Sequence, residues 1–303
     1  MTALRAVHEV GTAVAVLDGD VELFRYVYRP EHPQVESPRP YLHPLRTRSG
    51  ALVSLYRPHD HVWHKGITWS LPVVEDENFW GGPTYVHGRG YTALPNNGSQ
   101  RHRGDLRVTA EGDAVVLDHE LDWVTQSGEL WFAERRTLSA TPVSDDAWAL
   151  TFATALRNVR GAAISLGSPT TRGRENAGYG GLFWRGPRSF TGGTLVAPGV
   201  RGGDELRGQR HEWMAFAGRH DETDDASVLL MLDDASNVQH PPQWFARTAE
   251  FAALNPAQFF SEEHVVPADG LLRLRYGVGV ASGTADDAPA LAAAVRQALA
   301  ARR

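Results

Sequence analysis

The chain has 303 residues, of which 42% are hydrophobic and 22% charged, and its formal net charge is −6 at pH 7. This composition is typical of a globular protein, and the negative charge argues against nucleic acid or an anionic membrane as the main partner. The absence of cysteine excludes disulfides, thiol nucleophiles and thiolate metal sites. No stretch approaches the roughly 18 apolar residues of a membrane-spanning helix, and the N-terminus lacks the apolar core of a signal peptide. We therefore expect a cytoplasmic protein.

The N-terminal region predicts a hairpin followed by an extended loop. Residues 12–17 and 21–28 flank an Asp-Gly step, which is a strong signal for a tight turn between two strands. Residues 29–45 contain five prolines. Proline fixes φ and cannot donate to a strand ladder, so this segment predicts an extended loop.

The densest group of ionisable side chains lies in residues 57–66. Three of the thirteen histidines and one carboxylate fall within six residues: His59, Asp60, His61 and His64. Each neutral imidazole brings a donor and an acceptor that need partners, so such a cluster usually faces a ligand, a metal or a proton. The flanking residues 51–56 and 67–71 predict strands, which puts the histidines at a corner between two strands.

Two glycine-rich segments, residues 77–104 and 167–203, predict ordered loops that line a site. They are too glycine-rich for regular structure and too aromatic for a disordered linker. Long loops inside a compact domain are usually functional, although the first segment also fits a surface loop without a ligand. The second matches neither a phosphate-binding loop nor a dinucleotide fingerprint, so we expect no nucleotide site.

The rest of the chain predicts antiparallel strands and one helix. Residues 115–124 and 129–138 form a predicted hairpin, and residues 147–156 place large side chains on one face and alanines on the other. Such a strand is typical of close packing between stacked sheets. Further strands are predicted at residues 213–218, 227–232, 244–251, 258–263 and 272–280.

Residues 286–302 predict the helix, with Asp286 or Asp287 as its N-cap and apolar side chains at four-residue spacing. No repeat, coiled coil or low-complexity linker divides the chain. We therefore expect one all-β domain over residues 1–303, a large antiparallel β-sandwich with a C-terminal α-helix.

Several motifs together resemble a bacterial family of unknown function that is labelled PmoA-like or methane oxygenase PmoA. They are residues 39–45 (RPYLHPL), Gly50, residues 58–66 (PHDHVWHKG), 78–80 (NFW), 255–256 (NP) and 259–263 (FFSEE). The label does not describe this chain, because a methane monooxygenase subunit would be an integral membrane protein. Many relatives have a His-His pair where this chain has Trp63-His64, which weakens a metal site built on adjacent histidines.

The resemblance implies a β-sandwich of the galactose-mutarotase type and a role near sugar catabolism. In such sandwiches the concave face of the larger sheet holds a sugar, and opposed histidine and carboxylate groups move protons at its anomeric or ring oxygen. On this basis His61 or His64 is the candidate general acid. Glu262 or Glu263 is the candidate base, because the adjacent Phe259 and Phe260 would raise its pKa.

The predicted binding residues combine flat aromatic faces for a sugar ring with donors for hydroxyl or carboxylate groups. They are His59, Asp60, Trp80, Tyr85, Asn97, His102, Arg174, Tyr179 and Arg185, with Asn96 and Trp184 as further candidates. Trp184 fits core packing better than the site, and Arg185 also fits a local ion pair. A divalent metal, such as zinc, manganese or iron, could be held by His59 and His61 with His64 or Asp60, although this spacing differs from the helical His-Glu-x-x-His motif.

The sequence therefore predicts a sugar-acting enzyme, namely a lyase, hydrolase or epimerase that works on a sugar or an oxidised sugar derivative. One alternative is a non-catalytic carbohydrate-binding protein with the same aromatic cleft. Another is a structural or interaction protein, which would have no deep polar cleft near the histidines. The enzyme hypothesis requires the histidines near position 60 and the acidic pair near position 262 to converge. The partner we expect is a small-molecule sugar, and the sequence leaves the oligomeric state open.

Overall fold

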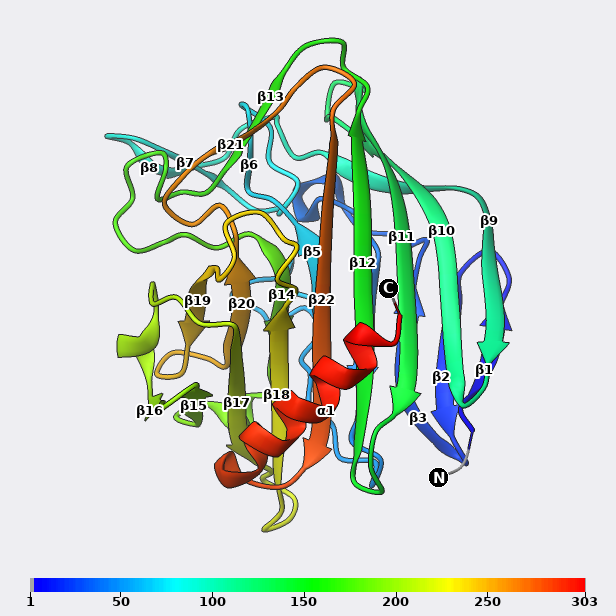
Figure 1. The fold of residues 1–303 in the computed structure, drawn as a ribbon. Coiled ribbons are helices and arrows are strands. Elements are labelled where there is room, and N and C mark those ends of the chain that lie inside the picture. Colours follow the sequence, from blue (N-terminus) through cyan, green and yellow to red (C-terminus); the bar gives the residue numbers. More distant parts are fainter. Residues whose placement is uncertain (1–2, 303) are drawn as a thin grey trace.

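Two large antiparallel sheets face each other in the computed structural model, which describes residues 3–302 (Figure 1). Across these residues, one sheet has eight strands and the other has nine. The eight-stranded sheet runs in the order β1 (Arg5–Glu9), β2 (Ala13–Asp18), β3 (Val21–Val27), β4 (Tyr41–Leu45), β5 (Ile67–Ser70), β14 (Gly181–Arg185), β20 (Ala253–Ala257) and β19 (Gln243–Arg247). The nine-stranded sheet runs in the order β16 (Val200–Gly202), β15 (Thr194–Ala197), β17 (Trp213–Arg219), β18 (Ala226–Asp233), β22 (Leu271–Ser282), β12 (Ala147–Asn158), β11 (Leu130–Pro142), β10 (Ala114–Val124) and β9 (Ser99–Glu111).

Shorter elements complete the described chain. The small sheets contain β6 (Val73–Val74), β13 (Ile164–Gly167) and β21 (His264–Val266), and the hairpin of β7 (Thr84–Val86) and β8 (Gly90–Thr92). The helical elements are η1 (Gln34–Glu36), η2 (Arg188–Phe190), η3 (Asp204–Leu206), η4 (Ala285–Asp287) and α1 (Ala288–Ala300). No helix in residues 3–302 combines the length and the hydrophobicity needed to cross a membrane. The predicted all-β class, with antiparallel sheets and a C-terminal helix, is confirmed.

Large aromatic side chains fill the space between the two sheets. Trp69 and Trp184 come from the eight-stranded sheet, Trp123 and Trp148 come from the nine-stranded sheet, and all four are completely buried. Trp69 meets Trp123 edge-on, with ring centroids 5.1 Å apart. Burial of each large apolar side chain contributes on the order of 2–3 kcal/mol, so this layer is a main source of stability. Trp184 is therefore a core residue.

The alanine face of β12 packs against a helix, which corrects the prediction that it lies between stacked sheets. Ala147 and Ala149 belong to an apolar cluster with Val295 of α1. On the adjacent strand β22, a Cβ atom at Gly277 or Gly279 would lie 2.5 or 2.6 Å from a methyl group of Val295. Small residues on both strands thus let α1 lie close to the outer face of the nine-stranded sheet (Figure 1).

Most of the predicted strands are present, with two clear errors. Residues 51–56 form only isolated bridges, since the Leu55 N–H donates to the Arg185 carbonyl rather than to a regular ladder. Residues 258–263 form the turn between β20 and β21, and Phe259 and Phe260 are both buried there. The burial of consecutive side chains is incompatible with the alternation of a half-buried strand. The predicted hairpins at residues 12–28 and 115–138 are confirmed.

Candidate functional site

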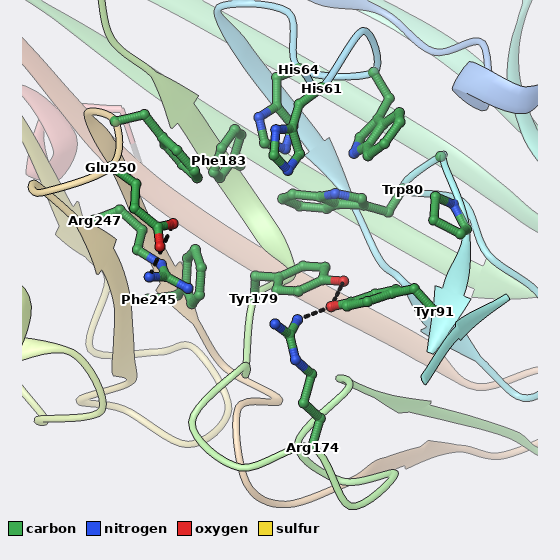
Figure 2. A pocket seen from close by; sticks show the side chains of 14 residues that line it. His61, His64, Trp80, Tyr91, Arg174, Tyr179, Phe183, Phe245, Arg247 and Glu250 are labelled. Atoms are coloured by element: carbon green, nitrogen blue, oxygen red, sulfur yellow. Dashed lines mark hydrogen bonds and ion pairs between the residues drawn. The ribbon is translucent and has the colours of Figure 1, made fainter. Parts of the chain in front are cut away.

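A cavity of about 310 Å³ lies against the eight-stranded sheet (Figure 2). Phe183 of β14 lines it, whereas the neighbouring Leu182 and Trp184 point into the core. Successive strand residues point to opposite faces, so the cavity lies on the outer face of this sheet. The resemblance implied a sugar site on the larger sheet, and the cavity instead lies on the smaller one. Its lining is mainly aromatic, with Trp63, Trp80, Tyr91, Tyr179, Phe183, Phe245 and Phe251, and its ionisable residues are His61, His64, Arg174, Arg247 and Glu250.

A buried network of charges holds the histidine loop (residues 57–66) in place. The Glu36 carboxylate lies 2.6 Å from Arg57 Nη2 and 3.0 Å from Lys65 Nζ. Arg39 donates to the Trp63 carbonyl at 2.8 Å and to the Glu36 carbonyl at 2.9 Å. Burial, and then the nearby Arg39, lower the pKa of Lys65 to about 7. Arg39, Arg57 and Lys65 therefore hold the loop from outside the cavity lining.

His61 and His64 stack on each other with ring centroids 4.7 Å apart and planes 15° apart. His61 Nδ1 lies 3.0 Å from the Asp60 carboxylate, and a carboxylate only accepts, so the ring donates through Nδ1. His64 Nδ1 lies 3.3 Å from Arg185 Nη1, and a guanidinium only donates, so this nitrogen accepts. In their neutral forms the two rings therefore differ at Nε2. His61 has a lone pair there, and His64 has an N–H.

The surroundings of His64, Arg185 and Asp60 shift the proton affinity of each. Burial lowers the pKa of His64 well below its ordinary value, and the nearby His61 and Arg185 lower it further, so His64 stays neutral at pH 7. Burial also lowers the pKa of Arg185 to about 10, in spite of the nearby Asp60. Partial burial alone would raise the pKa of Asp60, but the hydrogen bond from His61 and the charge of Arg185 outweigh it, and the pKa is lowered. Of the two predicted acids, His64 is thus held neutral by its surroundings.

Aromatic rings form the walls on either side of the histidines. Trp80 lies 4.9 Å from both Tyr179 and Phe183, measured between ring centroids, and Phe183 lies 4.6 Å from His64. Figure 2 shows the two imidazoles directly above the Trp80 ring. Burial, followed by contact with Tyr91, raises the pKa of Tyr179 well above its usual range, so its hydroxyl stays protonated. The walls offer flat apolar surfaces with a few polar tips, as sugar-binding sites require.

Charged residues gather away from the histidines. Figure 2 shows Arg174 at the opposite end of the cavity, where it donates to the Tyr91 hydroxyl. That hydroxyl lies 2.9 Å from the Tyr179 hydroxyl. Arg247 pairs with Glu250 at 3.3 Å along another wall. The cavity therefore joins an acid–base end to an arginine-rich end across an aromatic floor.

Seven of the predicted site residues meet at this cavity. His61, His64, Trp80, Arg174 and Tyr179 line it, and Asp60 and Arg185 contact the two histidines from behind. The histidine-rich segment and parts of both glycine-rich segments thus converge. This convergence supports the interpretation of those segments as site-lining.

The acidic pair near position 262 does not line the cavity. Glu263 accepts a hydrogen bond from the Ser165 hydroxyl at 2.7 Å, and Glu262 is exposed on the turn after β20. The turn carries both carboxylates to another part of the surface, so the expected meeting of His61 with Glu262 does not occur. Glu250, on the loop between β19 and β20, is the carboxylate in the lining.

Two further predicted binding residues lie near the cavity but outside its lining. His59 is exposed, and its Nδ1 lies 2.9 Å from Arg188 Nη2. Tyr85 packs edge-on against Tyr91, with ring centroids 5.8 Å apart. His59 belongs to a surface ion cluster with Arg188 and Asp60. Tyr85 supports the ring of Tyr91, which Arg174 contacts.

The other predicted residues have structural partners elsewhere. The Asn97 side chain is buried against Ser37, and the Asn96 side chain accepts from Thr84 at 3.0 Å. His102 lies 2.9 Å from His119, measured between their Nδ1 atoms, in a network between the sheets. These side chains order loops or the core, and sequence position alone could not separate them from the site residues.

The proposed metal set is not assembled. In residues 3–302, no group of three or more histidine, aspartate or glutamate side chains is arranged to hold a metal ion. His59 faces Arg188, and His64 Nδ1 faces the Arg185 cation, so these nitrogens do not point to a common centre.

Several lining residues were missed from sequence, and they had signals of different strength. Phe183 could have been found, because it alternates with the core residues Leu182 and Trp184 in one short strand. Glu250 and Phe251 had no local signal, since the pairing of β19 with β20 brings their loop to the cavity.

Fold and site together define an antiparallel β-sandwich protein with an aromatic cavity and a histidine pair. The chain belongs to a family of unknown function (DUF6807), whose model matches residues 13–295. That description does not mention PmoA, and the resemblance to the PmoA-like family stays a prediction. No curated protein matches the chain in sequence.

Weak similarity is found to solved structures of sugar-related enzymes. A putative aldose 1-epimerase from Klebsiella pneumoniae is 13% identical with a TM-score of 0.38, and the match covers 72% of this chain and 63% of that one. An alpha-galactosidase from Lactobacillus brevis is 11% identical with a TM-score of 0.41, covering 93% of this chain and 39% of that one. A GH36 alpha-galactosidase from Geobacillus stearothermophilus, in complex with raffinose, is 11% identical with a TM-score of 0.38, covering 93% and 40%. The chain spans less than two thirds of the length of each, and the superpositions are too distant to carry a functional argument.

Proposed function

We propose that the chain is an enzyme that moves protons on a sugar or an oxidised sugar derivative, with His61 as the base in place of Glu262, on which the predicted histidine–glutamate mechanism depended. The observation that carries this proposal is the stacked pair of imidazoles above Trp80, one with a free acceptor and the other with a free donor. Asp60 orients His61 and stabilises the imidazolium that forms when His61 takes a proton. The aromatic walls hold the apolar faces of the sugar ring.

His64 has a different role in this proposal. It stays neutral because of burial, so it donates a hydrogen bond from Nε2 rather than a full proton. A neutral imidazole beside a base stabilises the oxygen that becomes negative when a proton is removed from the neighbouring carbon. This arrangement favours a lyase or an epimerase.

A glycoside hydrolase of the common type is less well supported. Such enzymes place two carboxyl groups on either side of the scissile bond. Within the described residues, Glu250 is the one carboxylate of the lining, and it is paired with Arg247. We therefore rank proton abstraction at carbon above hydrolysis.

The alternative function is non-catalytic carbohydrate binding. The aromatic floor formed by Trp80, Tyr179 and Phe183 would serve a binding protein equally well. A binding protein would not need the fixed tautomers of His61 and His64, and this feature favours the enzyme.

A deuterium-exchange experiment tests the proposal. The protein is first screened by thermal shift against sugars, sugar acids and keto-sugars, because a ligand of the folded form raises Tm. Each ligand that binds is then incubated with the protein in D₂O and followed by proton NMR for loss of a carbon-bound proton or for a new product. His61→Ala is expected to slow this reaction by about 10²–10⁴-fold and to leave Kd within about tenfold.

The matched control is His59→Ala, which removes an exposed histidine of the same loop that lies outside the cavity lining. It should retain the wild-type rate. Ligand binding without exchange or product in the wild type would establish the binding protein. An unchanged rate in His61→Ala would overturn the role of that residue.

A further inference from the structure

We infer that the sugar bound in this cavity carries a carboxylate, and that Arg174 and Arg247 hold the carboxylate end away from the histidines. This inference rests on the proposed function and names the substrate class of the same site. The expected ligand of the cavity is a uronic acid or a similar sugar acid.

The first support is the incomplete pairing of Arg174. Its guanidinium donates to the Tyr91 hydroxyl and lies over the Tyr91 ring, with Cζ 4.6 Å from the ring centroid. In residues 3–302, no carboxylate lies within ion-pair distance of it. A guanidinium has five N–H donors, so most of those of Arg174 remain available at the cavity wall.

The second support comes from unpartnered nitrogens of Arg247, which lines the cavity, and of the neighbouring Arg207. The Nε atoms of Arg207 and Arg247 are both buried, and neither has a hydrogen-bond partner. Burial, and then the charge of the neighbouring Arg247, lower the pKa of Arg207, which shows that these cations are crowded. Arg247 has Glu250 at 3.3 Å and Asp204 at 3.9 Å as its carboxylate partners.

Asp204 contributes one negative charge, and its Oδ1 is also held by neutral donors. It accepts from the Thr248 N–H at 2.5 Å, from the Thr248 hydroxyl at 2.9 Å and from the Ala249 N–H at 3.3 Å. Three guanidinium groups, those of Arg174, Arg207 and Arg247, are thus balanced by two carboxylates. The excess of one positive charge in this group beside the cavity would be neutralised by a ligand monoanion.

The nature of that monoanion follows from charge and shape. The planar fork of arginine matches a carboxylate with two parallel hydrogen bonds. A phosphate ester carries close to two negative charges and would leave an excess negative charge here, so a carboxylate is the better match. A cavity of about 310 Å³ is at the small end for ligand sites, which fits a single sugar ring.

Matched pairs of sugars test the inference on the intact protein. Isothermal titration calorimetry compares D-glucuronate with D-glucose, D-galacturonate with D-galactose, and D-mannuronate with D-mannose. Charge-assisted hydrogen bonds should make the uronate of the preferred pair about tenfold to a hundredfold tighter. Raising NaCl from about 50 mM to about 500 mM should weaken the uronate and leave the neutral sugar unchanged, because only the former is bound through charge.

The variant Arg174→Gln should remove the preference, so that uronate and neutral sugar bind alike. Arg174→Lys keeps the charge but loses the fork, and should retain part of the preference. The control is Arg160→Gln, which removes an arginine stacked on Trp131 away from the cavity, and it should keep the full preference.

The outcomes separate this inference from the proposed function. Equal, salt-independent binding of uronates and neutral sugars by the wild type would overturn the inference and leave a sugar site in place. A full uronate preference in Arg174→Gln would overturn the assignment of that residue. Tighter binding of glucose 6-phosphate than of glucuronate would replace the carboxylate with a phosphate. The absence of binding by all six sugars would count against the proposed sugar site itself.

Discussion

Two pairs of histidines lie close together within residues 3–302, and their surroundings differ. The rings of His61 and His64 are 4.7 Å apart at the cavity, and those of His102 and His119 are 5.1 Å apart between the sheets. His119 uses both nitrogens within the protein, with Nε2 2.8 Å from the Tyr26 hydroxyl and Nδ1 2.9 Å from His102. Each cavity histidine uses Nδ1 and leaves Nε2 without a partner among the described residues. Free hydrogen-bonding capacity, rather than proximity, distinguishes the candidate site.

The His102–His119 pair belongs to a larger polar network in the core. Arg136 is completely buried, and its two hydrogen bonds to the Glu134 carboxylate measure 2.7 and 2.9 Å. It also lies 3.4 Å from the Tyr26 hydroxyl, which joins the ion pair to the histidines. Burial lowers the pKa of His119 to about 2 and raises the pKa of Tyr26 to about 12. His119 and Tyr26 therefore both stay neutral at pH 7, so the network does not change its protonation there.

The largest effect is expected from breaking the ion pair of this network. Glu134→Ala leaves the Arg136 cation buried without its partner, which should lower the free energy of unfolding by about 3–5 kcal/mol. Urea denaturation measures the change. The exposed pair of Glu120 and Arg103 provides the control, and Glu120→Ala should cost less than about 1 kcal/mol. Equal losses in the two variants would show that the buried network is not a main source of stability.

A second prediction compares one histidine from each pair. His119→Leu deprives Tyr26 and His102 of a buried partner and should lower the free energy of unfolding by about 1–3 kcal/mol. His61→Leu changes a partly exposed side chain and should alter stability by no more than about 0.5 kcal/mol, although it removes the proposed base. Urea denaturation of both variants, with the exchange assay, checks the contrast. The reverse order of stability losses would contradict it.

The last expected effect is a pH dependence that belongs to the core pair. His119 has a pKa of about 2 when folded and near 6.5 when unfolded, so below pH 6.5 the unfolded chain binds more protons than the folded one. The contribution of His119 to the free energy of unfolding is therefore fully present above pH 6.5. It falls as the pH is lowered, by up to about 1.4 kcal/mol per pH unit. Urea unfolding between pH 7.5 and pH 5, in the wild type and in His119→Leu, measures the difference, because carboxylates affect both proteins alike. A slope that His119→Leu leaves unchanged would assign the acid sensitivity to other groups.

Much of the fold was predictable because its signals are local. The two-residue alternation in β22 and β12 marks strands without knowledge of their neighbours, and Asp18-Gly19 marks a tight turn. The strand predicted at residues 258–263 is wrong because its signal was also purely local. Phe259 and Phe260 are apolar and favour strands, yet both are buried in a turn whose position depends on distant elements.

The site was predictable only in part. The density of histidines in residues 57–66 by itself indicates chemistry, and His61 and His64 do line the cavity. The base was expected at Glu262 because of its aromatic neighbours, but the sheet brings Glu250 to the lining instead. His102 could not be separated from His61 in sequence, because the difference lies in which partners the folded chain provides.

The sequence by itself determined the β-class of the protein, the C-terminal helix and the segment that carries the histidines, because side-chain periodicity, turn residues and clustering are properties of neighbouring residues. Tertiary structure decided which face of which sheet holds the cavity, which imidazole nitrogens remain free, and that arginines occupy its far end. These features depend on the placement of β14 between β5 and β20, two strands that are distant from it along the chain. Pairing between distant strands brings such side chains together, and no local pattern records it.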